Sequence, residues 1–171
     1  MNIDQLKSAI IDVPDFPKEG VIFKDITPLL EDSHAFDSLI HHMCESIDKK
    51  PNKLVAIESR GFILGAAMAS KMHCGLVLAR KTGKLPSKTF SQEFKLEYGT
   101  DTLEIHQSSL SSEDRVVIVD DVLATGGTAE AAAKICAQAG AEILSYSFLI
   151  ELGFLSGKQK LSAPIHSLIK Y

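Results

Sequence analysis

The fold of this chain is decided by the stretch Arg115-Val116-Val117-Ile118-Val119-Asp120-Asp121-Val122-Leu123-Ala124-Thr125-Gly126-Gly127-Thr128. Residues 116–119 form an unbroken β-branched run, which is typical of a strand covered on both faces. Two acids follow, then two glycines that can turn freely, and then an alanine-rich segment with high helix propensity. We therefore expect a central strand of a parallel sheet, a loop that presents backbone N–H groups, and a helix.

The loop of Thr125, Gly126, Gly127 and Thr128 has the chemistry of an anion-binding turn. A phosphate placed there would meet the free N–H donors and the positive dipole end of the helix, together with two hydroxyls. Turns of this kind also start helices in proteins that bind no ligand. The loop alone therefore leaves both interpretations open.

Asp120 and Asp121 favour the interpretation as a ligand site. They come at the C-terminal end of the predicted strand, where open α/β sheets bind their ligands. Because two adjacent carboxylates would repel a bare phosphate, we expect their partners to be hydroxyls or a metal ion. A sugar that carries a phosphate on one side and vicinal hydroxyls on the other satisfies the loop and the acids together.

Length and composition limit the kinds of protein that this chain can be. With 171 residues, 45% hydrophobic and 23% charged, we expect one globular domain over residues 1–171. The formal net charge of −4 offers no basic surface to a nucleic acid, so a small ligand is expected. Without a secretory pattern or a membrane-length apolar run, we expect no export and no membrane partner. The three cysteines are an odd number without metal-ligand spacing, so we expect the protein to be located in the reducing cytoplasm.

Short apolar runs alternate with segments of helical spacing along the rest of the chain. Strands are expected at residues 54–57, 76–79, 103–106, 142–150 and 165–171, with an edge strand at 21–23. Helices are expected at residues 1–11, 33–47, 63–72, 129–139 and 154–160. The alternation predicts an α/β fold with an open, mostly parallel central sheet flanked by helices.

Charged residues follow two of these strands. Glu58 and Arg60 lie between a strand and a helix, and Arg80, Lys81 and Lys84 follow the next strand. By residue type alone, the first pair could be a surface ion pair and the three cations a solvated turn. Residues 89–96 are polar, with little core to hold them, and predict a hairpin or a mobile loop.

The opening stretch resembles the ribose-phosphate signature of the phosphoribosyltransferases, in which a hydrophobic strand leads through two acids to Ala-Thr-Gly-Gly-Thr. The whole chain is most similar to the branch of that family that acts on adenine. Four further motifs agree in order, and they read Asp-Phe-Pro…Gly-Val-Ile-Phe-Lys-Asp-Ile-Thr-Pro, Glu-Ser-Arg-Gly, Arg-Lys-Thr-Gly-Lys-Leu-Pro and Leu-Glu-Tyr-Gly. The resemblance implies the type I phosphoribosyltransferase fold with a small hood.

The resemblance also implies the residues of the site. Residues 1–31 would contribute the hood, with Phe23 stacking on the purine and Lys24 standing where the family usually has arginine. Residues 85–106 would form a flexible lid that closes over the reaction. The catalytic residues implied are Glu97, Tyr98, Asp120 and Asp121. The substrate-binding residues implied are Phe23, Lys24, Glu58, Ser59, Arg60, Gly61, Arg80, Lys81, Lys84, Ala124, Thr125, Gly126, Gly127 and Thr128.

The reaction that the family implies joins adenine to 5-phospho-α-D-ribose 1-diphosphate and gives AMP and diphosphate, a step of purine salvage. Mg²⁺ is the expected cofactor, held mainly by the substrate near Asp120 and Asp121, and a homodimer is expected. One alternative is a phosphoribosyltransferase for another nucleobase, against which the hood motif argues. The other is a regulator that senses phosphoribosyl diphosphate, for which the chain has no room for a DNA-binding module.

Overall fold

The computed structural model describes residues 1–95 and 99–171, and the chain divides into two compact units, residues 1–42 and 43–171. The first unit contains α1 (Ile3–Ser8), β1 (Ile11–Pro14), β2 (Ile22–Asp25), α2 (Thr27–Glu31) and most of α3 (Ser33–Glu45). β1 and β2 pair as a two-stranded antiparallel sheet. The helix expected at the N-terminus and the strand expected near residue 22 are both confirmed, with shifted ends.

Side-chain caps set the starts of α1 and α3. Asn2 and Gln5 form a capping box, in which each side-chain oxygen accepts the other residue's backbone N–H at 2.9 Å. The Asp32 carboxylate accepts the backbone N–H groups of His34 and Ala35 at 2.8 and 2.9 Å. The acid at position 32 is therefore the cap of α3, because it satisfies two N–H groups that have no partner inside the helix.

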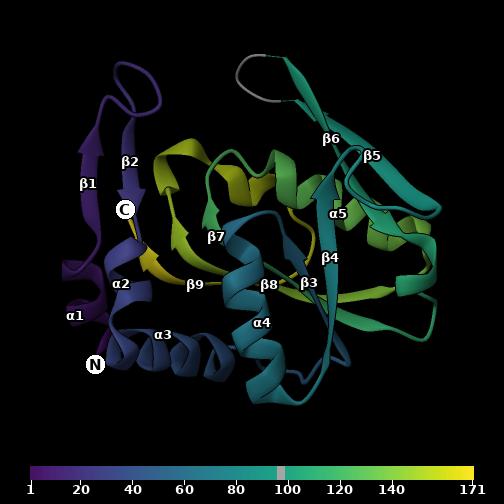
Figure 1. The fold of residues 1–171 in the computed structure, drawn as a ribbon, viewed down its shortest axis with the longest axis horizontal. Coiled ribbons are helices and arrows are strands. Elements are labelled where there is room, and N and C mark those ends of the chain that lie inside the picture. The colour runs from purple at the N-terminus through teal and green to yellow at the C-terminus, as the bar shows by residue number, and fades with distance from the viewer. Residues whose placement is uncertain (96–98) are drawn as a thin grey trace. The chain divides into compact units, whose positions relative to one another are not determined.

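The second unit is built on a seven-stranded sheet with the order β5-β6-β4-β3-β7-β8-β9 (Figure 1). Its strands are β3 (Lys53–Ile57), β4 (Gly75–Lys81), β5 (Thr89–Lys95), β6 (Thr100–His106), β7 (Arg115–Leu123), β8 (Glu142–Glu151) and β9 (Ile165–Lys170). Five neighbouring strands of the sheet are parallel, namely β4, β3, β7, β8 and β9. Strand β6 is antiparallel to both β4 and β5. The predicted open, mostly parallel α/β sheet is confirmed.

The two long helices of this unit, α4 (Arg60–Met72) and α5 (Gly127–Gln138), pack on opposite faces of the sheet. The connection through α4 leads from β3 to β4, whereas the connection through α5 leads the other way along the sheet, from β7 to β8. Right-handed crossovers in opposite directions place their helices on opposite faces. Val55 shares a buried cluster with Ile135 of α5, while its neighbour Ala56 faces Gly65 of α4.

Several element boundaries differ from those expected. β7 continues past residue 119 to Leu123, because β8 supplies pairing partners as far as Glu151. α4 begins at Arg60, three residues before the expected start. The helix expected at 154–160 is instead two short 3₁₀ helices, η2 (Gly153–Leu155) and η3 (Gly157–Lys160), separated by Ser156 with a left-handed φ of 55°. A further 3₁₀ helix, η1 (Gln107–Ser109), follows β6. Among the described residues, no helix is long and apolar enough to cross a membrane.

Candidate active site

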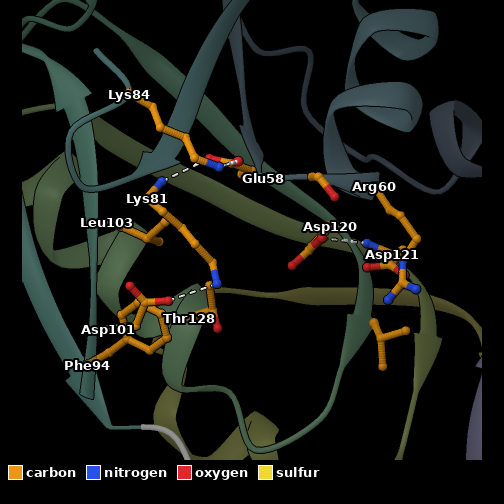
Figure 2. A pocket seen from close by; sticks show the side chains of 12 residues that line it. Glu58, Arg60, Lys81, Lys84, Phe94, Asp101, Leu103, Asp120, Asp121 and Thr128 are labelled. Atoms are coloured by element: carbon orange, nitrogen blue, oxygen red, sulfur yellow. Dashed lines mark hydrogen bonds and ion pairs between the residues drawn. The ribbon is translucent and has the colours of Figure 1, made fainter. Parts of the chain in front are cut away.

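The change of direction between β3 and β7 creates the site. These strands are parallel neighbours, and the chain leaves their C-terminal ends in opposite directions, which is where open α/β sheets bind ligands. A cavity of about 700 Å³ lies here, a volume typical of small-molecule sites (Figure 2). It is lined by Glu58, Ser59, Arg60, Lys81, Lys84, Phe94, Asp101, Leu103, Asp120, Asp121, Val122 and Thr128.

Glu58 gathers positive charge at one end of this cavity. Its side chain is 9% exposed and forms ion pairs with Lys84 and, at 3.4 Å, with Arg80. It also accepts the backbone N–H of Lys81 at 3.0 Å. Burial opposes its ionisation, but the Lys84 and Lys81 hydrogen bonds and the nearby cations outweigh burial, so the pKa of Glu58 lies below its ordinary value. Glu58 is thus an anion that orients cations.

The acid pair lies on β7 and lines the same cavity. Asp121 is buried, and its Oδ2 lies 2.5 Å from Nε of Arg60 at the start of α4. Asp120 accepts the backbone N–H of Asp121 at 2.9 Å and lines the cavity. Burial raises the pKa of Asp120 well above its ordinary value, and the Asp121 carboxylate raises it further. The two adjacent acids therefore differ: the Arg60 guanidinium contacts Asp121, whereas Asp120 is buried beside the Asp121 carboxylate.

Gly61 allows α4 to begin this close to β7. A Cβ atom at Gly61 would lie 3.0 Å from both Oδ1 of Asp120 and the carbonyl oxygen of Val119. A side chain would push the helix and the strand apart, and with them Arg60 and Asp121. The glycine is therefore a packing requirement of the site and is not among the cavity-lining residues.

The predicted anion loop forms a second, smaller cavity of about 70 Å³ next to the first. Asp120, Val122 and Thr128 line both cavities, and the smaller one is also lined by Leu123, Ala124, Thr125, Gly126, Gly127, Ala129 and Phe148. Gly126 has a φ of +78° and precedes the first residue of α5. The left-handed turn allows the loop to enter α5 directly, so the helix N–H groups are at the loop.

The structure brings most of the predicted site residues together, in the two cavities. Arg80 does not line either cavity, since its guanidinium lies over the Phe62 ring at 5.9 Å and next to Glu58. Phe23 and Lys24 lie on β2 in the first unit, where Phe23 packs edge-to-face on Phe16 at 5.2 Å and Lys24 pairs with Asp12 at 2.6 Å. Glu97 and Tyr98 lie outside the described residues.

Four residues of the large cavity were not predicted from the sequence: Phe94, Asp101, Leu103 and Val122. Phe94 and Asp101 are cross-strand partners in the β5–β6 ladder, and Asp101 and Leu103 are two residues apart on β6. All three side chains therefore lie on the same face of the hairpin. The spacing of two could have indicated from the sequence which residues share a face. Which face of the hairpin meets the cavity, however, depends on how β6 pairs with β4.

Comparisons with known proteins agree with this geometry. Residues 29–160 match the family model described as phosphoribosyl transferase domain. The chain is 50% identical over 171 residues to an adenine phosphoribosyltransferase of Geotalea uraniireducens, covering 99% of this chain and 100% of that protein. The solved adenine phosphoribosyltransferase of Thermoanaerobacter pseudethanolicus is 47% identical with a TM-score of 0.97, covering 99% and 100% of the two chains. That of Saccharomyces cerevisiae, solved with an imino-altritol bisphosphate and adenine, is 39% identical with a TM-score of 0.93, covering 97% of each chain.

Proposed function

This chain belongs to the phosphoribosyltransferase family, and we propose that it transfers the phosphoribosyl group of 5-phospho-α-D-ribose 1-diphosphate to adenine, releasing AMP and diphosphate. The observation that carries this function is that two neighbouring cavities, each with groups that can bind an anion, share Asp120 and Thr128 in their linings. One site offers helix N–H groups to the 5-phosphate, and the other offers Arg60, Lys81 and Lys84 to the diphosphate. The ribose then lies beside the acid pair.

The residues act by positioning the reactants and by neutralising charge. Adenine N9 bonds to the anomeric carbon while the bond from that carbon to the diphosphate oxygen breaks, and the leaving electron pair stays on the diphosphate. The proton that adenine loses from its five-membered ring passes to a base, the part proposed for Glu97. The cations at Glu58 stabilise that charge as it forms, and Asp120 and Asp121 accept hydrogen bonds from the ribose hydroxyls. No covalent nucleophile is required. Glu58 itself, held ionised by its cations, orients them without contacting the diphosphate.

The acid pair fits a magnesium ion that arrives with the substrate. Carboxylate oxygens are preferred ligands of Mg²⁺, which is often held by one or two carboxylates together with substrate phosphates. Within residues 1–95 and 99–171, no group of three or more His, Cys, Asp and Glu could hold a metal without further ligands. Asp120 and Asp121 would hold such an ion directly or through its water molecules, and it would neutralise charge on the leaving diphosphate.

Phe23 is the residue that we propose to stack on the base. Phe23, on β2, offers an aromatic ring to adenine, and its contact with Phe16 holds the ring from the side. Backbone N–H and C=O groups nearby would match the N1 acceptor and N6 donor of adenine, and a 6-oxopurine would mismatch both. Lys24 pairs with Asp12, so we assign it to the hairpin and not to the reading of the base.

A direct assay tests the proposed function. Purified protein with Mg²⁺, labelled adenine and phosphoribosyl diphosphate is expected to form labelled AMP, with little product from hypoxanthine, guanine, xanthine or orotate, because mispaired buried groups cost about 1–3 kcal/mol each. Turnover with one of those bases instead of adenine would establish the alternative nucleobase. Binding of phosphoribosyl diphosphate without any turnover would favour a sensor.

Replacing Glu97 by alanine is expected to slow the chemical step by about 100-fold and to leave the melting temperature unchanged. Residues 85–106 act as a lid in our proposal, and Glu97 would then hold a proton for the purine or the ribose, with Tyr98 beside it. Single-turnover kinetics measure this step. Glu93→Ala, on the same hairpin, is the control and should react at the normal rate. Equal rates for both variants would remove Glu97 from the mechanism.

An apolar surface on α4 and β4 supports the expected homodimer. Ile63, Leu76 and Leu78 are 44%, 38% and 37% exposed, and a Cβ at Gly65 of α4 would lie 3.3 Å from Leu76. Leu78→Asp is therefore expected to give monomers by light scattering, because the charge would be buried at the interface. Phe154→Asp, at a residue 73% exposed on η2, should leave the dimer intact. A dimer that survives Leu78→Asp would place the interface elsewhere.

The cytoplasmic location of the protein stays a prediction from its sequence.

A further inference from the structure

Among the described residues, Asp101 is the carboxylate of the β5–β6 hairpin that lines the large cavity, and the proposed reaction assigns it no part. Its Oδ2 lies 2.9 Å from Nζ of Lys81, and its Oδ1 accepts the backbone N–H of Thr102 at 2.8 Å. Because both oxygens are engaged, the carboxylate has a fixed direction. The Lys81 side chain is 54% exposed and that of Asp101 22%, so the pair borders the open part of the cavity.

Lys81 is held at both ends. Its backbone N–H donates to Glu58, and its ammonium group contacts Asp101, so the side chain extends across the cavity between them (Figure 2). The surrounding backbone is also tied down, since Thr82 N–H donates to Thr102 O at 3.2 Å and Gly83 N–H donates to Glu104 at 3.1 Å. Without these contacts the long lysine side chain would sample many rotamers, so the contacts confine it to one direction.

We propose that Asp101 is a positioning residue, which keeps Lys81 extended across the cavity in the free protein and gives it up to the diphosphate group when substrate binds. This inference rests on the proposed function, because it takes the diphosphate to be the anion that Lys81 meets. The exchange is electrostatically favourable, because a diphosphate carries several negative charges. The partly exposed ion pair between Lys81 and Asp101, by contrast, contributes little stabilisation. The Lys81 hydrogen bond keeps the pKa of Asp101 below its ordinary value, so the carboxylate is charged at neutral pH.

The proposal predicts that removing the carboxylate strengthens binding. Asp101→Asn frees Lys81 from its competitor, so the dissociation constant for magnesium diphosphate, measured by calorimetry, should fall by about three- to tenfold. Asp101→Glu keeps the charge and should restore a value close to that of the unchanged protein. Glu93→Gln removes the same charge from the same hairpin, outside the large cavity, and should leave the constant unchanged.

A double variant separates the proposed pair from a general effect of charge. In a Lys81→Met background, Asp101→Asn should no longer strengthen diphosphate binding, because there is no lysine to release. Equal strengthening in both backgrounds, or no strengthening in either, would overturn the proposal, as would weaker binding by Asp101→Asn itself. Failure of the unchanged protein to bind diphosphate would instead refute the proposed function, so the two failures are distinct.

Discussion

Asp121→Asn is expected to reduce kcat/KM by about 10²- to 10³-fold while shifting the melting temperature by no more than about 4 °C. The buried carboxylate contacts Arg60 and, in the proposed function, faces the ribose, so its charge would act on the reacting sugar. Its loss should cost little stability, because Arg60 is 37% exposed and can be hydrated, and because repulsion from Asp120 disappears. Steady-state kinetics and thermal unfolding of the same preparation measure the two effects.

Asp114→Asn is the matched control for that experiment. Asp114 is also a buried acid, but it lies in the turn before β7, where it pairs with Lys53 at 2.9 Å and accepts the Ser111 N–H at 2.8 Å. It should lose about 1–3 kcal/mol of stability and keep its activity at temperatures where it is folded. Equal losses of stability and activity in Asp121→Asn would make the acid pair a structural feature.

Gly126→Ala is expected to destabilise the protein by about 2–5 kcal/mol and to raise the KM for phosphoribosyl diphosphate more than tenfold in whatever folded protein remains. An added Cβ would lie 2.4 Å from the carbonyl oxygen of Gly157 on η3, and φ at Gly126 is +78°. The methyl group must displace either η3 or the glycine loop, which we propose as the 5-phosphate site. Urea unfolding and steady-state kinetics give the two quantities.

Gly83→Ala separates the two causes. Gly83 has a φ of +79°, but an added Cβ would find no atom within 4 Å. It therefore has the conformational cost alone, about 1 kcal/mol, and only the difference from Gly126→Ala reports the contact with Gly157. If the two variants unfolded at the same urea concentration, the close approach of η3 to the loop would not contribute to stability.

The strands and helices of the second unit could be predicted because the periodicity of burial is a local property. The β-branched run at residues 116–119 predicts a strand buried on both faces, and β7 confirms it. The end of β7 could not be predicted, because Val122 and Leu123 stay in the strand only through their pairing with β8. The prediction of one helix at residues 154–160 was wrong, because Ser156 adopts a left-handed φ that separates η2 from η3.

The candidate site was predictable wherever a short motif contains its own chemistry. Glycines, hydroxyls and a helix start within residues 125–128 predict an anion loop once the acid pair before them is taken into account, and the resemblance to a known family assigned the charged residues after β3 and β4. The pairing of those charges was not predictable. Lys84 could have pointed to any acid, and it meets Glu58 because β3 and β4 are adjacent and parallel.

By itself the sequence of residues 115–128 determined a central strand, an acid pair and a glycine turn that starts a helix, because each depends on neighbours within a few positions. Only the tertiary structure decided that Arg60 contacts Asp121, that Lys81 contacts Asp101, and that Gly157 packs on Gly126. These partners are 20 or more residues apart and come together through strand order and register, which no local pattern encodes.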